Sequence, residues 1–271
     1  MDKRDILKSL NFGYDIAEYE AEFIGNYFVE TGQWKKIESG QVDVIYGLKG
    51  SGKSAIYYLL ISKEDEFFDR KILLAAAENV REDPAFSEIK NDSPPSEDEF
   101  VGLWKLYFCS VAAMRAKEYG ISNADLDTVI SRLKDLMLIE DGLSLNAILR
   151  MASDYVKRYF RPSTIEGGIA IDPLSGLPLG LNGKISFNEP SIEQRKLGIT
   201  PIRDLLATLN RAFVKSEYKM WLLLDRLDVA FAANSQLETR ALRALFRAYN
   251  DMSNLSNLRV KIFLRSDIWS R

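Results

Sequence analysis

The sequence predicts an α/β domain with a three-layer core and a mostly parallel sheet. Short apolar runs alternate with longer segments of helical periodicity, and a glycine-rich turn joins the first run to a helix. The chain has 271 residues, of which 46% are hydrophobic and 28% charged, as in ordinary soluble globular proteins. We expect one domain over residues 1–271, with an N-terminal helix and a helical plus β-hairpin insertion that includes about 154–191.

Four runs of apolar and β-branched residues are the candidate strands of the sheet. They lie at 42–46, 71–77, 220–224 and 259–264. Continuous apolar runs of this length, rather than alternating ones, are typical of strands that a parallel sheet buries on both faces.

Helical patterns fill most of the chain between these runs. Apolar residues at near-helical spacing from Ile16 to Ile37 predict an amphipathic helix that ends near Gly40. Ser96 followed by Glu99 is a capping-box pattern that predicts the start of a long helix. Further helices are expected at 54–62, 123–137, 144–160, 202–215 and 235–249.

The residues from 167 to 187 have a different composition. Ile169-Ala170-Ile171 and Lys184-Ile185-Ser186-Phe187 flank a Pro- and Gly-rich stretch that contains Asn182-Gly183. Such a pattern predicts a β-hairpin on the surface of the domain.

Two absences limit the chemistry that the chain can perform. It contains no histidine, which excludes Ser-His-Asp and Cys-His nucleophile pairs and zinc sites with an imidazole ligand. Its single cysteine, Cys109, cannot form an internal disulfide, which suits a reducing cytosol. Because Cys109 follows Tyr107 and Phe108 on an expected helix, we interpret it as a buried small residue rather than a nucleophile, and Trp104 and Tyr107 as core.

Charge and hydropathy indicate the cellular location of the protein. The N-terminus is charged, without the apolar segment of a signal peptide, and the longest aliphatic runs are too short to span a bilayer. We therefore expect a cytoplasmic protein that does not enter a membrane. The net charge of −3 gives no support to a surface built for nucleic acid, although it leaves a local basic patch open.

The strongest motif is a glycine-rich phosphate-binding pattern. Gly47-Leu48-Lys49-Gly50-Ser51-Gly52-Lys53-Ser54 fits G-x-x-x-x-G-K-[ST] at every fixed position, between a predicted strand and a predicted helix. A random chain of this length would contain the pattern on the order of 1% of the time. We predict that Gly47 to Ala55 bind nucleotide phosphates, that Lys53 contacts the β- and γ-phosphates, and that the Ser54 hydroxyl is a Mg²⁺ ligand. A glycine-rich loop with an incidental lysine is the alternative.

A second candidate site lies at the end of the third apolar run. Trp221-Leu222-Leu223-Leu224 is followed by Asp225, which we predict to be the Walker B acid that holds Mg²⁺ or its water. Three residues later, Asp228 has two interpretations of similar weight. It either polarises the attacking water, or it is a turn or capping acid.

Arginines supply further candidates for contact with phosphate. Arg265 follows the last strand and is suited to bind phosphate oxygens, but an ion pair with Asp267 is an equal alternative. Arg240, Arg243 and Arg247 share one face of an expected helix. That face is either a source of an arginine finger for a second subunit or, as charged faces usually are, a solvated surface.

Taken together, these motifs resemble the NACHT, STAND and KAP-like relatives of AAA+ ATPases, in which a second acid commonly lies three residues after the first. The pattern is similar to that of bacterial P-loop ATPases linked to antiphage defence. The resemblance rests on the acidic helix before the glycine-rich loop and on the segments Leu224-Asp225-Arg226-Leu227-Asp228 and Phe263-Leu264-Arg265-Ser266-Asp267. One departure is that no Glu directly follows Asp225, which makes Asp228 the expected catalytic acid.

The resemblance implies a P-loop NTPase (AAA+/STAND-like) core that binds and hydrolyses ATP with Mg²⁺, using Lys53, Asp225, Asp228 and Arg265. Hydrolysis would drive a conformational or assembly switch in bacterial defence, with a homo-oligomer in the ATP state and an effector protein as partner. Related ATPases usually add a fifth strand and a helical lid, so we expect this chain either to be the ATPase core of a longer product or to be a shortened relative without the lid and effector region. A small-molecule or nucleotide kinase, and a nucleotide-gated scaffold or nucleic-acid-binding module with little turnover, are the alternative functions.

Overall fold

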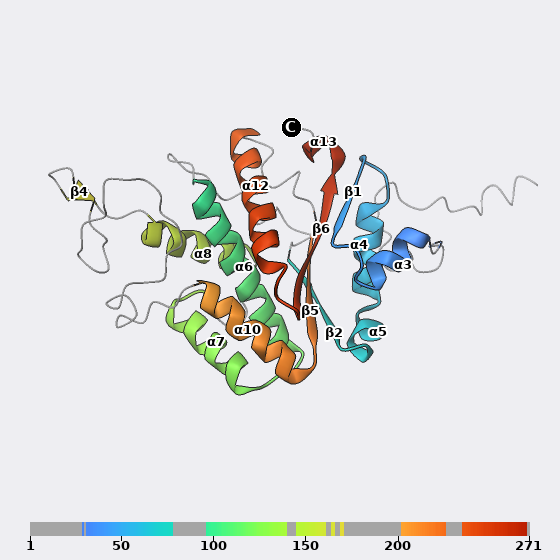
Figure 1. Ribbon diagram of the computed structural model, residues 1–271, viewed down its shortest axis with the longest axis horizontal. Coiled ribbons are helices and arrows are strands. Elements are labelled where there is room, and N and C mark those ends of the chain that lie inside the picture. Colours follow the sequence, from blue (N-terminus) through green and yellow to red (C-terminus); the bar gives the residue numbers. More distant parts are fainter. Residues whose placement is uncertain are drawn as a thin grey trace, which may run out of the picture.

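A computed structural model describes residue 29 and residues 31–77, 96–139, 145–160, 164–165, 169–170, 202–225 and 235–269. Within these residues the chain forms an α/β fold whose four-stranded sheet is entirely parallel, with helices on both faces (Figure 1). The α/β class and the parallel sheet predicted from the sequence are therefore confirmed.

The sheet strands coincide with the four predicted runs. They are β1 (Val44–Gly47), β2 (Ile72–Ala76), β5 (Lys219–Leu224) and β6 (Leu258–Arg265). Their order across the sheet is β1-β6-β5-β2, so β6 lies between β1 and β5. Because all four strands run in the same direction, their carboxyl ends meet at one edge of the sheet.

The order of the strands explains how the helices divide between two layers. The chain crosses the whole sheet from β1 to β2 and then returns through β5 and β6, and right-handed crossovers in opposite directions lie on opposite faces. One face carries α3 (Gly32–Glu38), α4 (Lys53–Ser62) and α5 (Glu64–Asp69) (Figure 1). The other face carries α6 (Glu97–Glu118), α7 (Ala124–Asp135), α8 (Leu145–Phe160), α10 (Ile202–Ser216) and α12 (Ser235–Met252).

Each face of the sheet has its own hydrophobic core. Trp221 and Leu223 of β5 face α4 and α5, whereas Leu222 and Leu224 face the layer of α6 and α12, as the alternation of side chains along a strand requires. Because both faces are buried, β5 carries an unbroken apolar run rather than an alternating one.

Helix α6 confirms the predicted capping box. The Ser96 hydroxyl accepts a hydrogen bond from Glu99 N at 3.2 Å, and the Glu99 carboxylate accepts one from Ser96 N at 2.6 Å. The helix is buried around most of its circumference, and Trp104 and Tyr107 lie in the core as expected. The Trp104 ring donates to Ala241 O at 2.9 Å and thereby joins α6 to α12.

The N-terminal helix differs from its predicted bounds. The described helix begins at Gly32, because Thr31 has an extended backbone and its hydroxyl caps the helix by accepting from Trp34 N. A single helix that runs through Thr31 is therefore wrong, whereas the predicted end near Gly40 agrees with the observed end at Glu38, and residues 16–28 lie outside the described residues.

The predicted insertion is described only in part. Residues 145–160 form α8, and a short antiparallel pair joins β3 (Thr164–Ile165) to β4 (Ile169–Ala170). The strand expected at 184–187 and the Asn182-Gly183 turn lie outside the described residues.

The outer edge of β2 is closed by side chains from the neighbouring helices. Leu74, at the middle of the strand, donates its N–H to the Tyr119 hydroxyl at 3.3 Å and accepts at its carbonyl from Arg115 Nε at 3.2 Å. Glu64 of α5 accepts from both side chains, with 2.5 Å to Arg115. Burial, followed by the hydrogen bond to Glu64, raises the pKa of Tyr119 to about 12. Within the described residues, Arg115 and Tyr119 thus pair with the Leu74 backbone groups at this edge, and Glu64 accepts from both side chains.

Among the described residues there is no helix with the length and apolar character needed to cross a membrane.

Candidate functional site

The glycine-rich loop joins the carboxyl end of β1 to the start of α4. Gly50 and Gly52 have φ values of +79° and +83°, a left-handed conformation that residues with a side chain rarely adopt. Gly52 is also the N-cap of α4, and as a glycine it has no side chain with which to cap this helix end. The loop therefore turns sharply into the amino-terminal end of α4, whose backbone amides and helix dipole favour an anion.

Lys53 is the first residue of α4, and its side chain folds back over the loop. Its ammonium donates to Gly47 O at 3.0 Å, to Leu48 O at 2.8 Å and to Ser51 Oγ at 3.4 Å. Although it carries a charge, Lys53 is only 8% exposed. These three contacts hold the positive charge inside the loop, next to the amides of α4.

The other residues of the predicted phosphate site surround Lys53. Leu48 to Gly52 are exposed, while Ser54 and Ala55 are half-buried at the start of α4. Ser51 packs beneath Gly47 so closely that a Cβ on Gly47 would lie 2.5 Å from Ser51 Oγ. The motif is therefore built as a compact loop whose outer surface is open to solvent.

Asp225 directly follows β5 and is only 5% exposed. Val44 of β1 and Leu224 of β5 are both register partners of Ile262 on β6, so Asp225 is level with Ile45, two residues before Gly47 at the end of β1. Two strand spacings, about 10 Å, separate the axes of β1 and β5. The sheet thus brings Asp225 to the same edge as the glycine-rich loop, on the next strand but one.

The two predicted metal ligands, Ser54 and Asp225, stand on different elements of this edge. Hydroxyl and carboxylate oxygens are ligands that suit Mg²⁺. Within the described ranges, no group of three or more Asp, Glu, Cys or His side chains could hold a metal ion. A cation between Ser54 and Asp225 would therefore take its remaining ligands from phosphate and water.

Arg265 ends β6, between the loop and Asp225. It is the register partner of Gly47, the first residue of the phosphate motif. Its guanidinium makes a two-point ion pair with Asp267, with 3.1 Å from Nε to Oδ1 and 2.7 Å from the terminal nitrogen to Oδ2. The ion pair with Asp267, one of the two predictions for Arg265, is therefore present. It lies beside the glycine-rich loop, at which Arg265 was predicted to contact phosphate. Asp228, the other predicted catalytic acid, lies outside the described residues.

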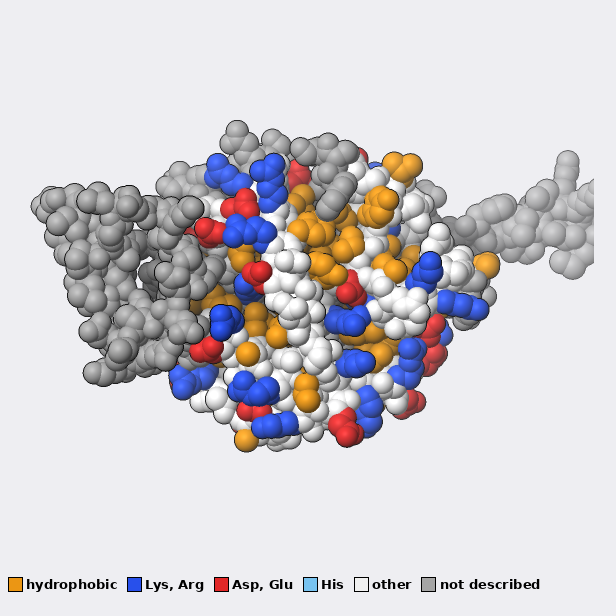
Figure 2. All heavy atoms as spheres, in the orientation of Figure 1, with side chains coloured by type: hydrophobic (Ala, Val, Ile, Leu, Met, Phe, Trp, Pro, Cys, Tyr) orange, Lys and Arg blue, Asp and Glu red, His pale blue; other side chains and the backbone are white. Residues whose placement is uncertain are grey.

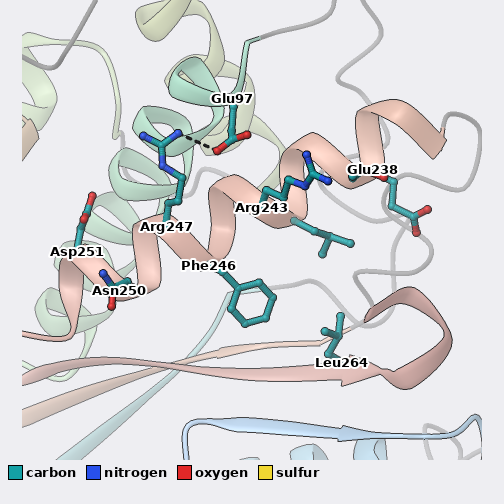
Figure 3. A pocket seen from close by; sticks show the side chains of 10 residues that line it. Glu97, Glu238, Arg243, Phe246, Arg247, Asn250, Asp251 and Leu264 are labelled. Atoms are coloured by element: carbon teal, nitrogen blue, oxygen red, sulfur yellow. Dashed lines mark hydrogen bonds and ion pairs between the residues drawn. The ribbon is translucent and has the colours of Figure 1, made fainter. Parts of the chain in front are cut away.

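The three arginines of α12 are exposed and do not form one equivalent group. Arg247 is ion-paired with Glu97 at 2.8 Å and Asp98 at 2.9 Å, and the hydrogen bond with Glu97 raises its pKa. Figure 3 shows Arg247 turned toward Glu97, with Arg243 one turn earlier along the helix. Within the described part of the chain, Arg247 is thus held by ion pairs to the start of α6.

Arg243 and Arg247 border a cavity of about 730 Å³ between α12 and β6, with Leu242, Phe246 and Leu264 among its other lining residues. Hydrophobic side chains gather at this place in the face drawn in Figure 2, where basic and acidic side chains are otherwise interspersed. Leu264 belongs to the core on the α6 and α12 side, whereas Lys53 lies on the opposite layer. The cavity is therefore separate from the glycine-rich loop.

Cys109 is fully buried in α6, and burial raises the pKa of its thiol to about 12. A thiol of this kind is a poor nucleophile because the reactive form is the thiolate. The interpretation of Cys109 as a core residue is confirmed.

Comparison of the chain with protein-family models, with curated proteins and with solved structures gave no match.

Proposed function

We propose that this protein binds ATP together with Mg²⁺ and hydrolyses it. The observation that carries the proposal is the loop from Gly47 to Ser54, in which the amino-terminal end of α4 and a buried lysine ammonium converge beside Arg265. Backbone amides, a helix N-terminus and a fixed cation are the features that recognise a chain of phosphates.

Each residue at this edge would have a separate role in phosphoryl transfer. Lys53 would exchange its loop carbonyls for β- and γ-phosphate oxygens, while the amides of α4 hold the bridging region. Ser54 and Asp225 would hold Mg²⁺, which neutralises charge on the phosphates when bound. Arg265 would stabilise charge on the terminal phosphate, and we assign the orientation of the attacking water to Asp228.

Assignment to the P-loop NTPases, and to their AAA+/STAND-like branch, belongs to the same proposal. The parallel sheet, with the loop, Arg265 and Asp225 on three adjacent strands, supports it. A switch coupled to a homo-oligomer and an effector protein, a role in bacterial defence and a cytoplasmic location rest on the sequence resemblance and composition. They stay predictions.

Phosphate release from Mg-ATP, without any acceptor molecule, tests the proposal directly. We expect turnover in the full chain and a loss of about a hundredfold or more in Lys53→Ala and in Asp225→Asn. Lys134→Ala is the matched control, because it removes an exposed lysine on α7. Chelation of Mg²⁺ should also abolish release.

The outcomes separate the alternative functions. Release that persists in folded Lys53→Ala protein would overturn the proposal. ADP formation that requires an added acceptor would indicate a kinase, and tight binding without turnover would indicate a nucleotide-gated scaffold. Turnover that rises more steeply than linearly with protein concentration would locate part of the catalytic site between subunits.

A further inference from the structure

The ion pair between Arg265 and Asp267 has the geometry of a phosphate contact. Both carboxylate oxygens of Asp267 accept from the guanidinium, one from Nε and one from a terminal nitrogen. A guanidinium binds two phosphate oxygens through the same pair of parallel donors. A phosphate that approaches Arg265 in this way must therefore displace Asp267.

The pair lies where a nucleotide phosphate would arrive. Arg265 is the last residue of β6 and the register partner of Gly47, and the chain turns at once into α13 (Ser266–Trp269), which brings Asp267 back against it. The Arg265 and Asp267 side chains are 30% and 42% exposed, so both are accessible from solvent. The local turn thus fixes a carboxylate next to the loop that the proposed function assigns to phosphates.

We propose that Asp267 is a positioning residue that holds Arg265 in the nucleotide-free protein and competes with the terminal phosphate of ATP for its guanidinium. The inference rests on the proposed function and adds a specificity device to the same site. ATP binding would require Arg265 to exchange one carboxylate for phosphate oxygens, and would leave Asp267 close to a new negative charge. ADP lacks the terminal phosphate and would leave the pair intact. Asp267 would therefore reduce the preference of the protein for ATP over ADP.

Calorimetric titration of the full chain tests this competition, with Mg²⁺ and either ADP or a non-hydrolysable ATP analogue. Because the pair is partly exposed, we expect Asp267→Asn to tighten binding of the ATP analogue by about twofold to fivefold. ADP affinity should stay unchanged. Asp251→Asn is the matched control, since Asp251 is also an exposed acid in an ion pair, with Lys105 at 2.6 Å.

The double variant Arg265→Ala/Asp267→Asn shows whether the effect passes through Arg265. In the Arg265→Ala background, Asp267→Asn should no longer improve the preference for the ATP analogue over ADP. An equal improvement in both backgrounds, or an equal change for both nucleotides, would overturn the inference. If the wild type binds nucleotide and Asp267→Asn binds both ligands as the wild type does, the competition fails and the proposed function stands. If the wild type binds neither nucleotide, both fail.

Discussion

Lys261 Nζ lies 2.9 Å from Asp43 Oδ1, and Lys261 has no exposed surface at all. The ammonium also donates to Val42 O at 2.5 Å and lies 4.2 Å from the centre of the Trp221 ring. Lys261 of β6 thus fixes the chain that leads into β1, and with it the strand that carries the glycine-rich loop.

Removing one partner of this pair should destabilise the fold. Lys261→Met leaves the Asp43 carboxylate, which is only 20% exposed, without its closest cation, so we expect the free energy of unfolding to fall by about 3 kcal/mol. Urea denaturation measures the change. The double variant Lys261→Met/Asp43→Asn should recover most of the loss, and a double variant as unstable as the single one would contradict the interpretation.

The same lysine makes stability depend on pH. Burial, opposed by the nearby Asp43, lowers the pKa of Lys261 below its ordinary value of 10.5. Between the lowered pKa and 10.5 the unfolded chain holds a proton that the folded chain has released, so the free energy of unfolding rises with pH in that window. Because Lys261→Met lacks this group, the stability advantage of the wild type over the variant should grow as the pH approaches 10.5. A stability difference between wild type and Lys261→Met that does not change with pH would contradict this interpretation of Lys261.

Cys109 should resist thiol reagents in the native protein. Its pKa of about 12 and its complete burial leave almost no reactive thiolate near pH 8. Because the chain has one cysteine, labelling with a chromogenic disulfide reports on this position alone. We expect full labelling in denaturant and very slow labelling without it. Rapid labelling of native protein would show that α6 opens readily.

Arg115 and Arg247 offer a matched comparison of two ion-paired arginines. Arg115 contacts Glu64, Glu118 and Leu74 O, whereas Arg247 pairs with two acids at the exposed start of α6. We expect Arg115→Ala to lower the free energy of unfolding by about 1–3 kcal/mol, because it leaves the Leu74 carbonyl with fewer donors. Arg247→Ala should cost less than about 1 kcal/mol. Equal losses in thermal or urea denaturation would refute this difference.

Alanine substitutions at Gly52 and Gly32 distinguish backbone strain from side-chain crowding. A Cβ on either residue would meet no atom within 4 Å, but only Gly52 has a left-handed φ, of +83°. Gly52→Ala should therefore lower the free energy of unfolding by about 1–2 kcal/mol. Gly32→Ala, in the first turn of α3, should raise it by about 0.4–1 kcal/mol. Changes of the same sign in urea denaturation would exclude backbone conformation as the cause.

The strands could be predicted because both faces of the sheet are buried, which makes their sequences continuous apolar runs. Helix α5 was not predicted, since Glu64–Asp69 is mostly charged and its buried residue, Phe67, is held by Trp221 at a ring-centre distance of 5.4 Å. That contact joins residues far apart in sequence. The ion pair of Lys261 was not predicted either, although a lysine within the apolar run of β6 indicates that a charged partner lies nearby.

The glycine-rich loop between β1 and α4 was predicted from local residue spacing, and its binding of phosphates stays a prediction. The pairing of Arg265 with Gly47 was not predicted, because it depends on β6 lying between β1 and β5. Strand order follows from the crossovers and their packing, which no local pattern encodes. Asp267 was foreseen as a partner of Arg265 because it lies only two residues away.

The side chains that close the edge of β2 also guard the protein against aggregation. An open strand edge is a template on which a second chain adds a strand, and Arg115 and Tyr119 occupy the Leu74 backbone groups that such a strand would need. Glu64 accepts hydrogen bonds from both side chains, so Glu64→Ala would loosen them together. The first intermolecular sheet to form in the Glu64→Ala variant should therefore grow from β2, before the core of the domain unfolds.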